Sequence, residues 1–291
     1  LLGLTHNPEL QKFLFVMFLI TYLITLAGNL FISVIIFISP ALGSPMYSFP
    51  SYLFIIDIFC SSSIAPKMNF DLISEKNTIS FNGCMTQLFT EHLFAAAETI
   101  LLSVMAYDCY VAICKPLHCT TIMTRHLCAM LVGVAWLGGF LHSLVQLLLV
   151  LWLLFCGPNV INHFVCDLYP LLEVACTNTY VIGLLVVANS GLICLLNFLM
   201  LAASYIVILY SLRSHSADGR RKALSTCGAH FIVFALFFVP CIFTYMLPFS
   251  ILSIDKNMAL FYGILTPMLN PLIYTLRNEE VKNAMRKLFT W

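Results

Sequence analysis

Charged residues are scarce in this sequence. Its 291 residues include 14 Lys and Arg and 13 Asp and Glu, so 9% are charged, whereas soluble domains average about 25%. Hydrophobic residues make up 61%, more than a soluble core of this length needs. This composition excludes an ordinary soluble domain and predicts a membrane protein with several spanning helices. The net charge of +1 gives no indication of a nucleic-acid partner.

Three further absences narrow the function. No internal repeat of the kind that builds many transporters is visible, which disfavours a transporter or channel. The one Ser–His grouping, Ser225 with His230, has no acid nearby to orient the histidine, so we expect no enzyme. No Asn-x-Ser/Thr sequon occurs, and the chain begins without Met. We therefore expect trimmed ends, and no cleavable signal peptide because the first apolar run is long enough to span.

Seven apolar runs are long enough to cross a bilayer. They cover residues 13–38, 46–72, 81–113, 126–154, 180–212, 222–247 and 257–276. A shorter stretch, 278–289, places Val281 and Met285 opposite Lys282 and Arg286 at helical spacing, which is typical of a helix on the membrane surface. We expect one all-α domain over residues 1–291, a seven-transmembrane helix bundle with a short amphipathic cytoplasmic helix.

The positions of Lys and Arg indicate the orientation in the membrane. Ten of the 14 fall on one side of the predicted spans, and four fall on the other. The ten are Lys115, Arg125, Arg213, Arg220, Arg221, Lys222, Arg277, Lys282, Arg286 and Lys287. Because cytoplasmic loops carry the excess of positive charge, this side is cytoplasmic. An odd number of spans then places the N-terminus outside the plasma membrane and the C-terminus inside.

Four of the 12 cysteines lie on the predicted outer side. They are Cys84, at the start of the third span, and Cys156, Cys166 and Cys176, ten residues apart in the loop between spans four and five. An even number of cysteines in an oxidising compartment predicts disulfides. The sequence alone allows three pairings. The other eight cysteines read as reduced, small apolar residues.

Two groups inside the spans are candidates for function. Asp57 and Glu98 are acids near the middle of spans two and three. Two close carboxylates in a low dielectric need a cation or a shared proton, although both could instead be neutral and structural. The second group, Glu91, His92, Ala95, Ala96 and Thr99, recurs at helical spacing in the outer half of the third span. This stripe could line a cavity or pack against another helix.

Several motifs carry a family resemblance that extends over nearly the whole chain. They are MAYDCYVAICKPL at 105–117, KALSTCGAH at 222–230, PMLNPLIYTLRN at 267–278 and SPMY at 44–47. These strings resemble the signatures of vertebrate olfactory receptors, which are rhodopsin-like G-protein-coupled receptors. The resemblance implies a receptor in the cell membrane that binds a small volatile odorant and activates a stimulatory G protein to raise cyclic AMP.

The resemblance also assigns roles to individual residues. It implies disulfides Cys84–Cys166 and Cys156–Cys176, and a sodium or proton site at Asp57 and Glu98, with no other cofactor or metal. The expected ligand pocket consists of His92, Ala95, Ala96, Thr99, Asn189, Ile193, Phe238, Cys241, Ile242, Tyr245 and Gly263. The expected G-protein coupling and switch residues are Asp108, Cys109, Tyr110, Tyr205, His230, Asn270, Pro271 and Tyr274.

Four positions depart from the family pattern, one of them Ala229, where the family has Ser before His230. Cys109 stands where the family has Arg, Pro50 where it usually has Leu, and Leu247 where it usually has Arg. Cys109 supplies neither the fixed charge nor the reach of an arginine. The alternative to a working receptor is therefore a decayed family member that folds but couples weakly or not at all.

Overall fold

The computed structural model describes most of the chain. The described residues are 1–5, 7–39, 48–74, 77–156, 159–214, 224, 228, 231–240, 259–277 and 279–289. Within them, five helices are long and apolar enough to cross a membrane. They are α1 (Pro8–Ile38), α2 (Ser48–Ile73), α3 (Phe81–Cys114), α5 (Arg125–Leu151) and α7 (Tyr180–Ser211).

Two shorter apolar segments fall inside the sixth and seventh expected spans. The first is the helix Phe231–Pro240. The second begins at residue 259 and contains the π-helical turn η5 (Phe261–Leu265) followed by α10 (Thr266–Arg277). After it comes α11 (Glu279–Phe289), which covers the expected surface helix. The all-α membrane bundle predicted from the sequence is confirmed.

Side-chain caps fix where the long helices begin. Asn7 caps α1, because its Oδ1 accepts hydrogen bonds from the backbone N–H groups of Glu9 and Leu10 at 3.0 and 3.4 Å. The helix therefore begins at Pro8, five residues before the start expected from the apolar run. Ser80 and Thr124 cap α3 and α5 in the same way. The start of α3 at Phe81 agrees with the expected one, and α5 begins one residue earlier than expected, at Arg125. Only the start of α1 was clearly misplaced, because its polar cap lies outside the apolar run.

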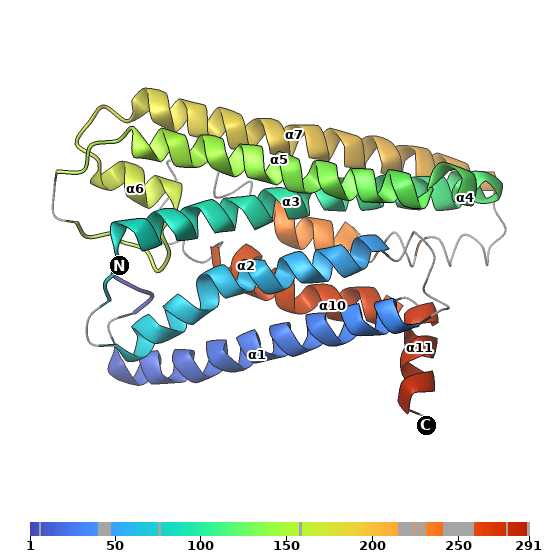
Figure 1. Ribbon diagram of the computed structural model, residues 1–291, viewed down its shortest axis with the longest axis horizontal. Coiled ribbons are helices and arrows are strands. Elements are labelled where there is room, and N and C mark those ends of the chain that lie inside the picture. Colours follow the sequence, from blue (N-terminus) through green and yellow to red (C-terminus); the bar gives the residue numbers. More distant parts are fainter. Residues whose placement is uncertain are drawn as a thin grey trace.

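Helix α3 is the centre of the bundle. It packs against α5 and α7 on one side and α2 on the other (Figure 1). At Gly139 of α5, a Cβ atom would lie only 2.6 Å from the carbonyl oxygen of Leu93 and 3.1 Å from the Cβ of Ala97. Glycine is therefore required there, because it lets the two backbones approach closely, as small residues do at membrane helix contacts.

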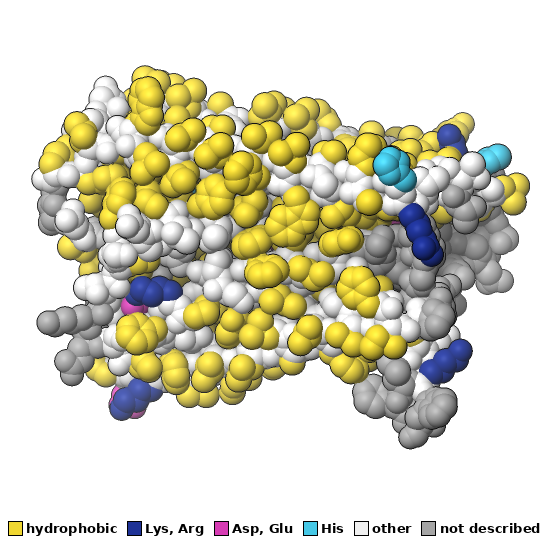
Figure 2. All heavy atoms as spheres, in the orientation of Figure 1, with side chains coloured by type: hydrophobic (Ala, Val, Ile, Leu, Met, Phe, Trp, Pro, Cys, Tyr) yellow, Lys and Arg dark blue, Asp and Glu magenta, His cyan; other side chains and the backbone are white. Residues whose placement is uncertain are grey.

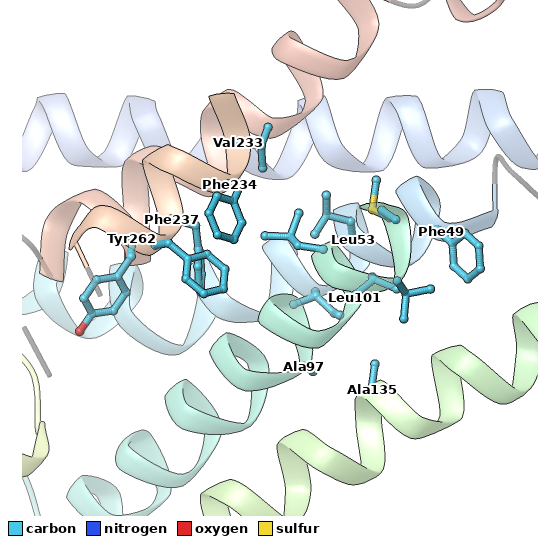
Figure 3. Close-up of a cluster of buried hydrophobic side chains, with 14 of the residues drawn as sticks. Phe49, Leu53, Ala97, Leu101, Ala135, Val233, Phe234, Phe237 and Tyr262 are labelled. Carbon is cyan, nitrogen blue, oxygen red and sulfur yellow. The ribbon is translucent and has the colours of Figure 1, made fainter. Parts of the chain in front are cut away.

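Apolar side chains fill the centre and cover the outside. The largest buried cluster joins Leu53 of α2, Leu101 of α3 and Phe237 of the sixth-span helix (Figure 3). Outside, exposed apolar residues include Phe13, Leu199 and Ile206. Hydrophobic side chains spread over the middle of the visible face, whereas Lys and Arg lie towards its two ends (Figure 2). An apolar belt between charged ends suits a protein surrounded by lipid.

Two prolines lie inside described helices, and Pro50 lies near a helix start. Pro66 and Pro271 occupy α2 and α10, which membrane helices tolerate when neighbours satisfy the freed backbone groups. The described part of α2 begins at Ser48, so Pro50 falls in its first described turn. A proline costs least in the first turn of a helix, where its missing N–H group has no intrahelical partner to lose.

Four short segments complete the described fold. One of them is the 3-10 turn η4 (Leu212–Ser214), which follows α7. The 3-10 turn η3 (Pro116–His118) and the one-turn helix α4 (Cys119–Ile122) connect α3 to α5 at one end of the bundle. At the other end, α6 (Leu168–Val174) belongs to the long loop between α5 and α7. The end that carries α6 lies opposite the end that carries α4 and α11 (Figure 1).

Candidate functional site

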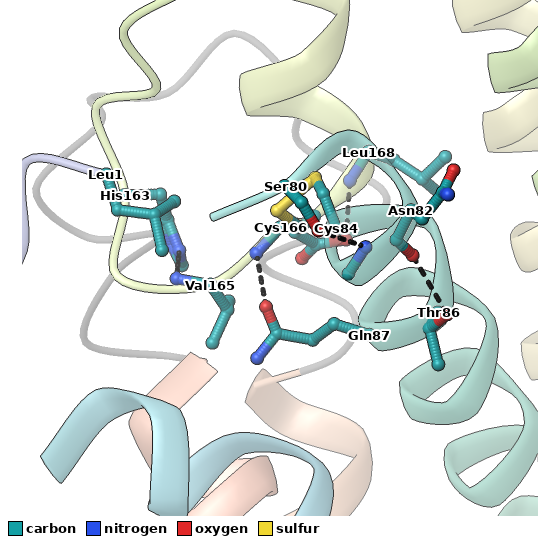
Figure 4. Close-up of a disulfide and its surroundings, with 12 residues drawn as sticks. Leu1, Ser80, Asn82, Cys84, Thr86, Gln87, His163, Val165, Cys166 and Leu168 are labelled. Atoms are coloured by element: carbon teal, nitrogen blue, oxygen red, sulfur yellow. Dashed lines mark hydrogen bonds between the residues drawn. A yellow bond between two sulfur atoms is a disulfide. The ribbon is translucent and has the colours of Figure 1, made fainter. Parts of the chain in front are cut away.

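A disulfide ties the long loop to α3 at the end that carries α6. Cys84 and Cys166 are joined, with their Cα atoms 5.3 Å apart (Figure 4). Gln87 stands one turn along α3 and strengthens this tie. Its Oε1 accepts a hydrogen bond from the backbone N–H of Cys166 at 3.1 Å, and its Nε2 donates to the carbonyl oxygen of Ser63 in α2 at 3.1 Å. One buried glutamine therefore connects the loop, α3 and α2.

The loop is also closed on itself. Cys156 and Cys176 are joined, with their Cα atoms 5.9 Å apart. Beside them, Phe155 and Ala175 form an isolated antiparallel bridge. The structure thus pairs the four outer cysteines in the arrangement that the family resemblance implies.

A buried polar group lies under the tied loop. The Tyr262 hydroxyl is 3.2 Å from Oε1 of Glu91 on α3 and 3.4 Å from Oδ2 of Asp167 in the loop. His92 approaches the other oxygen of Asp167, with Nε2 3.9 Å from Oδ1. Glu91, Asp167 and Tyr262 are each 1% exposed. The hydroxyl carries a single proton, so it can donate to only one carboxyl group at a time.

The expected pocket residues on α3 form one stripe whose outer end, at His92, contacts α5 and the long loop. His92, Ala96 and Thr99 are buried and Ala95 is half-buried. One turn further, Ser103 continues the stripe, and its hydroxyl donates to the carbonyl oxygen of Asn197 on α7 at 3.5 Å. The Thr99 hydroxyl donates within its own helix, to the carbonyl oxygen of Ala95 at 2.8 Å.

The other expected pocket residues come from three further segments. Asn189 and Ile193 are half-buried on α7, one helical turn apart. Phe238 is buried in the central cluster, where its ring stacks on Phe234 with centroids 4.0 Å apart. Gly263 in η5 faces α2, because a Cβ there would lie 2.5 Å from Cδ1 of Ile64. Cys241, Ile242 and Tyr245 lie outside the described residues.

The two mid-span acids meet below this region. Asn270 of α10 donates from Nδ2 to both oxygens of Asp57 at 3.0 Å and approaches Oε1 of Glu98 at 3.4 Å. All three residues have 0% exposure. Within the described part of the chain, Oε2 of Glu98 and Oδ1 of Asn270 have no hydrogen-bond partner. The described residues contain no group of three or more His, Cys, Asp and Glu suited to a metal ion.

The inner end of α3 packs against α7 through apolar contacts. Cys109 and Tyr110 contact the cluster formed by Ile208 and Leu212, and Tyr205 joins the same cluster. The Tyr205 ring also meets Phe231 of the sixth-span helix edge to face, with centroids 6.0 Å apart. Cys109 is half-buried. It therefore occupies a small apolar position between α3 and α7.

Asp108 is 5% exposed, although it lies near the end of its helix. Among the described residues, its Oδ1 accepts no hydrogen bond and no Lys or Arg forms an ion pair with it. Burial, together with the nearby Asp108 carboxyl group, raises the pKa of the Cys119 thiol in α4. Because Cys109 stands where the family has an arginine, Asp108 forms no ion pair with Lys or Arg among the described residues.

The remaining expected switch residues are only partly described. Pro271 is buried, and the Cβ position of Gly28 in α1 lies 3.7 Å from its Cγ. Nearby, Asn29 donates to the carbonyl oxygen of Pro267 at 2.9 Å, which fastens α1 to α10. His230 and the side chain of Tyr274 lie outside the described part.

Sequence reasoning missed several buried polar residues in the outer half, among them Asp167, Tyr262, His142 and Gln146. His142 and Gln146 lie on α5, where the His142 ring stacks on His92 with centroids 5.9 Å apart and the Gln146 amide donates to Ser190 of α7 at 2.9 Å. One available signal was the presence of polar residues one turn apart inside an apolar run. Tyr262 gave no comparable signal, because aromatic residues are common in spans.

Comparison with known proteins identifies the family. The family model described as olfactory receptor matches residues 18–290. The chain is 57% identical over 289 residues to human "Olfactory receptor 4A47", covering 99% of this chain and 94% of the relative. It is 56% identical over 287 residues to mouse "Olfactory receptor 4E2", covering 99% and 93%. Together with the apolar helical bundle, these matches show that the chain belongs to the olfactory receptor family and is a multi-pass plasma membrane protein.

Proposed function

We propose that this olfactory receptor binds small volatile apolar odorants in the outer half of its bundle and activates a stimulatory G protein that raises cyclic AMP. The observation that carries the proposal is the stripe His92, Ala96 and Thr99, which is buried in the outer half of α3 beneath the loop tied to this helix. Volatile ligands offer few hydrogen bonds, so their affinity comes from buried area and shape. As a member of this family, the receptor is not an enzyme.

The pocket is tested by filling it. Ala96→Phe adds a ring to a side chain that is 5% exposed, and we expect it to abolish responses across an odorant panel. Ala203→Phe is the matched control, because Ala203 is exposed on α7. Both variants are compared in a cyclic AMP assay at equal surface expression, in a Cys109→Arg background. Unchanged dose–response curves for Ala96→Phe would contradict the assignment of Ala96 to the odorant pocket.

A second candidate function is a family member that binds odorants without signalling. It is favoured by the half-buried Cys109 in an apolar cluster and by the absence, among described residues, of a cation paired with Asp108. In the family, an arginine at this point pairs with the preceding acid and reaches the inserted G protein. A cysteine is too short for either contact and is largely neutral at pH 7. Low cyclic AMP responses from the natural chain, restored by Cys109→Arg, support this candidate.

The acid pair is the candidate ion site beneath the pocket. The Asn270 amide bonds both Asp57 oxygens and lies near Glu98, and Glu98 Oε2 and Asn270 Oδ1 have no partner among the described residues. Carboxylate and amide oxygens suit a hard cation, and one shared proton also relieves the repulsion between two carboxylates. Asp57, Glu98 and Asn270 would therefore hold sodium or share a proton, which neutralises one negative charge.

The orientation of the chain is part of the proposal. The two disulfides lie at the end that carries α6, and disulfides persist in oxidising compartments. The ten Lys and Arg that mark the cytoplasmic side are assigned to the opposite end. An epitope tag placed before Leu1 should be labelled by antibody on intact cells. Labelling only after permeabilisation would place the N-terminus inside the cell and contradict the proposed orientation.

A further inference from the structure

A set of buried polar groups lies beside the expected pocket, between α5 and α7. We call it the α5–α7 polar set. It consists of His142 and Gln146 on α5 and Asn189 and Ser190 on α7. Gln146 is 0% exposed and His142 is 8% exposed. His142 and Gln146 are four residues apart on one helix, so they lie on the same face.

The hydrogen bonds of this set are incomplete. The Gln146 amide Nε2 donates to Oγ of Ser190 at 2.9 Å. Within the described part of the chain, Oε1 of Gln146, Nδ1 of His142 and Nδ2 of Asn189 have no hydrogen-bond partner. Leaving buried polar atoms without partners costs free energy, so such atoms usually meet a water molecule or a ligand. All three belong to side chains along one contact between α5 and α7, where Gln146 bonds Ser190 and His142 meets Asn189. We take this as an indication of a polar ligand group.

The set adjoins the apolar stripe on α3. The rings of His142 and His92 stack at an interplanar angle of 25°. Asn189 of α7 also makes a side-chain hydrogen bond with His142, which leaves Asn189 Nδ2 and His142 Nδ1 without partners among the described residues. Asn189 stands one helical turn before Ile193. A guest held by the polar set therefore extends along residues already expected to contact the apolar part of an odorant.

The free donors and acceptors of the α5–α7 polar set determine which functional group of a ligand can bind there. Gln146 Oε1 accepts, the Asn189 amide donates, and His142 Nδ1 does either according to its tautomer. A hydroxyl group both donates and accepts, so it satisfies the glutamine and the asparagine together. An ether oxygen only accepts, and a hydrocarbon does neither. A carboxylate also only accepts, and it would face the buried acids Glu91 and Asp167 nearby.

We propose that His142, Gln146 and Asn189 form a subsite for the hydroxyl group of an odorant alcohol, with the alkyl chain lying along Ala96, Thr99 and Ile193. The inference rests on the proposed odorant-binding function and adds the chemical class of the ligand. It also brings α5 into ligand recognition, through two residues that the sequence alone did not single out.

Direct binding tests the subsite without depending on coupling. The purified full chain in lipid nanodiscs is titrated with 1-octanol, 1-methoxyheptane and nonane, which have equal numbers of heavy atoms, and its thermal unfolding is followed. We expect 1-octanol to bind about tenfold more tightly than 1-methoxyheptane, the ratio expected for one buried hydrogen bond. Nonane should bind no better than the ether.

Matched variants test whether the preference for 1-octanol over 1-methoxyheptane depends on Gln146 and Asn189. Gln146→Met keeps the size of the side chain and removes the acceptor, so we expect the preference for the alcohol to fall below about twofold. Leu148→Met is the control, because Leu148 is 47% exposed on the outer surface of α5; it should keep the tenfold ratio. Asn189→Ala, at a half-buried position, provides a second variant if Gln146→Met folds poorly, and it should also lower the ratio.

The outcomes separate this inference from the proposed function. If none of the three compounds shifts unfolding, odorant binding itself is contradicted and the subsite falls with it. If 1-octanol and 1-methoxyheptane bind equally, odorant binding stands and the hydroxyl subsite is wrong, with a buried water filling the polar set. A preference that survives both Gln146→Met and Asn189→Ala also overturns the assignment, because the hydroxyl then binds elsewhere.

Discussion

The outer and inner ends of the bundle are held together by different forces. At the outer end, two disulfides and the Gln87 amide fix the loop to α3, and the Tyr262 hydroxyl lies within hydrogen-bond distance of carboxyl groups on α3 and the loop. At the inner end, α3 and α7 meet through Cys109, Ile208 and Leu212. Hydrogen bonds and disulfides depend on direction, whereas the hydrophobic effect does not.

This contrast suits a receptor that senses at one end and moves at the other. In the proposed function, the tied outer end holds the odorant and the inner end contacts the G protein. In this chain the inner end lacks the arginine that would make this contact. Recognition and coupling can therefore be separated by mutation.

Removing the outer disulfide should have the largest effect on this contrast. Cys84→Ser leaves the loop untied from α3, and the loss of such a bond costs about 2–5 kcal/mol. We expect surface expression to fall severely. Cys194→Ser is the matched control, because Cys194 is a half-buried free cysteine. Thiol mapping under non-reducing conditions checks the pairing, and free thiols at Cys84 and Cys166 in the natural chain would falsify it.

Removing one hydroxyl should loosen the outer end less. Tyr262→Phe leaves Glu91 and Asp167 without the shared donor, and hydrogen bonds to charged groups contribute about 1.5–3 kcal/mol. We expect lower thermal stability of the purified receptor. Tyr22→Phe removes a hydroxyl that lies 3.0 Å from the neutral Ser62 and should cost about 1 kcal/mol. Equal losses in the two variants argue against a special role for the tyrosine between the two acids.

Restoring the arginine should change the inner end alone. We expect Cys109→Arg to raise the cyclic AMP response about tenfold, or about 1.4 kcal/mol of coupling, because it supplies charge beside Asp108 and reach towards the G protein. Thermal stability and ligand affinity should stay close to natural values. Cys114→Arg places the same charge five residues further along as a control. A natural chain that already responds as strongly as Cys109→Arg refutes the argument.

Neutralising the acid between the two ends should have the smallest effect. In the Cys109→Arg background, Glu98→Gln keeps a group that can bond Asn270 but removes one negative charge. We expect basal cyclic AMP to change by about fivefold, a typical coupling between sites, and its dependence on sodium to disappear. Glu9→Gln, at an exposed acid, should do neither. If neither quantity changes in Glu98→Gln, Asp57 and Glu98 are structural acids only.

The sequence predicted the parts of the structure that depend on local pattern. Apolar run length predicted the helical membrane bundle, and helical spacing placed His92, Ala96 and Thr99 on one face. Mid-span acids are rare enough to be noticed singly, so Asp57 and Glu98 were predicted as a pair. The residue that joins them, Asn270, was expected only as part of a switch motif.

The parts that could not be predicted depend on long-range contacts. Asp167 gained its role because a disulfide draws its loop onto α3, and loop position has no periodic signal. His142 and Gln146 are single polar residues in an apolar run, so their meeting with Asn189 depends on the packing of α5 against α7. Gly263 was expected in the pocket wall, yet its Cβ direction points to Ile64 of α2.

The π-helical turn η5 has a consequence for variation in chain length. Such a turn holds one residue more than an α-helical turn, and each residue turns a helix by about 100°. Deleting one residue from Phe261–Leu265 would replace this turn by an ordinary α-helical turn. The residues on either side, Asn270 among them, would keep their faces, while the side chains within the turn would change direction. Tyr262 would then leave Glu91 and Asp167. The loss of one codon would thus change the contacts beneath the outer loop while the Asn270–Asp57 hydrogen bonds stay in place.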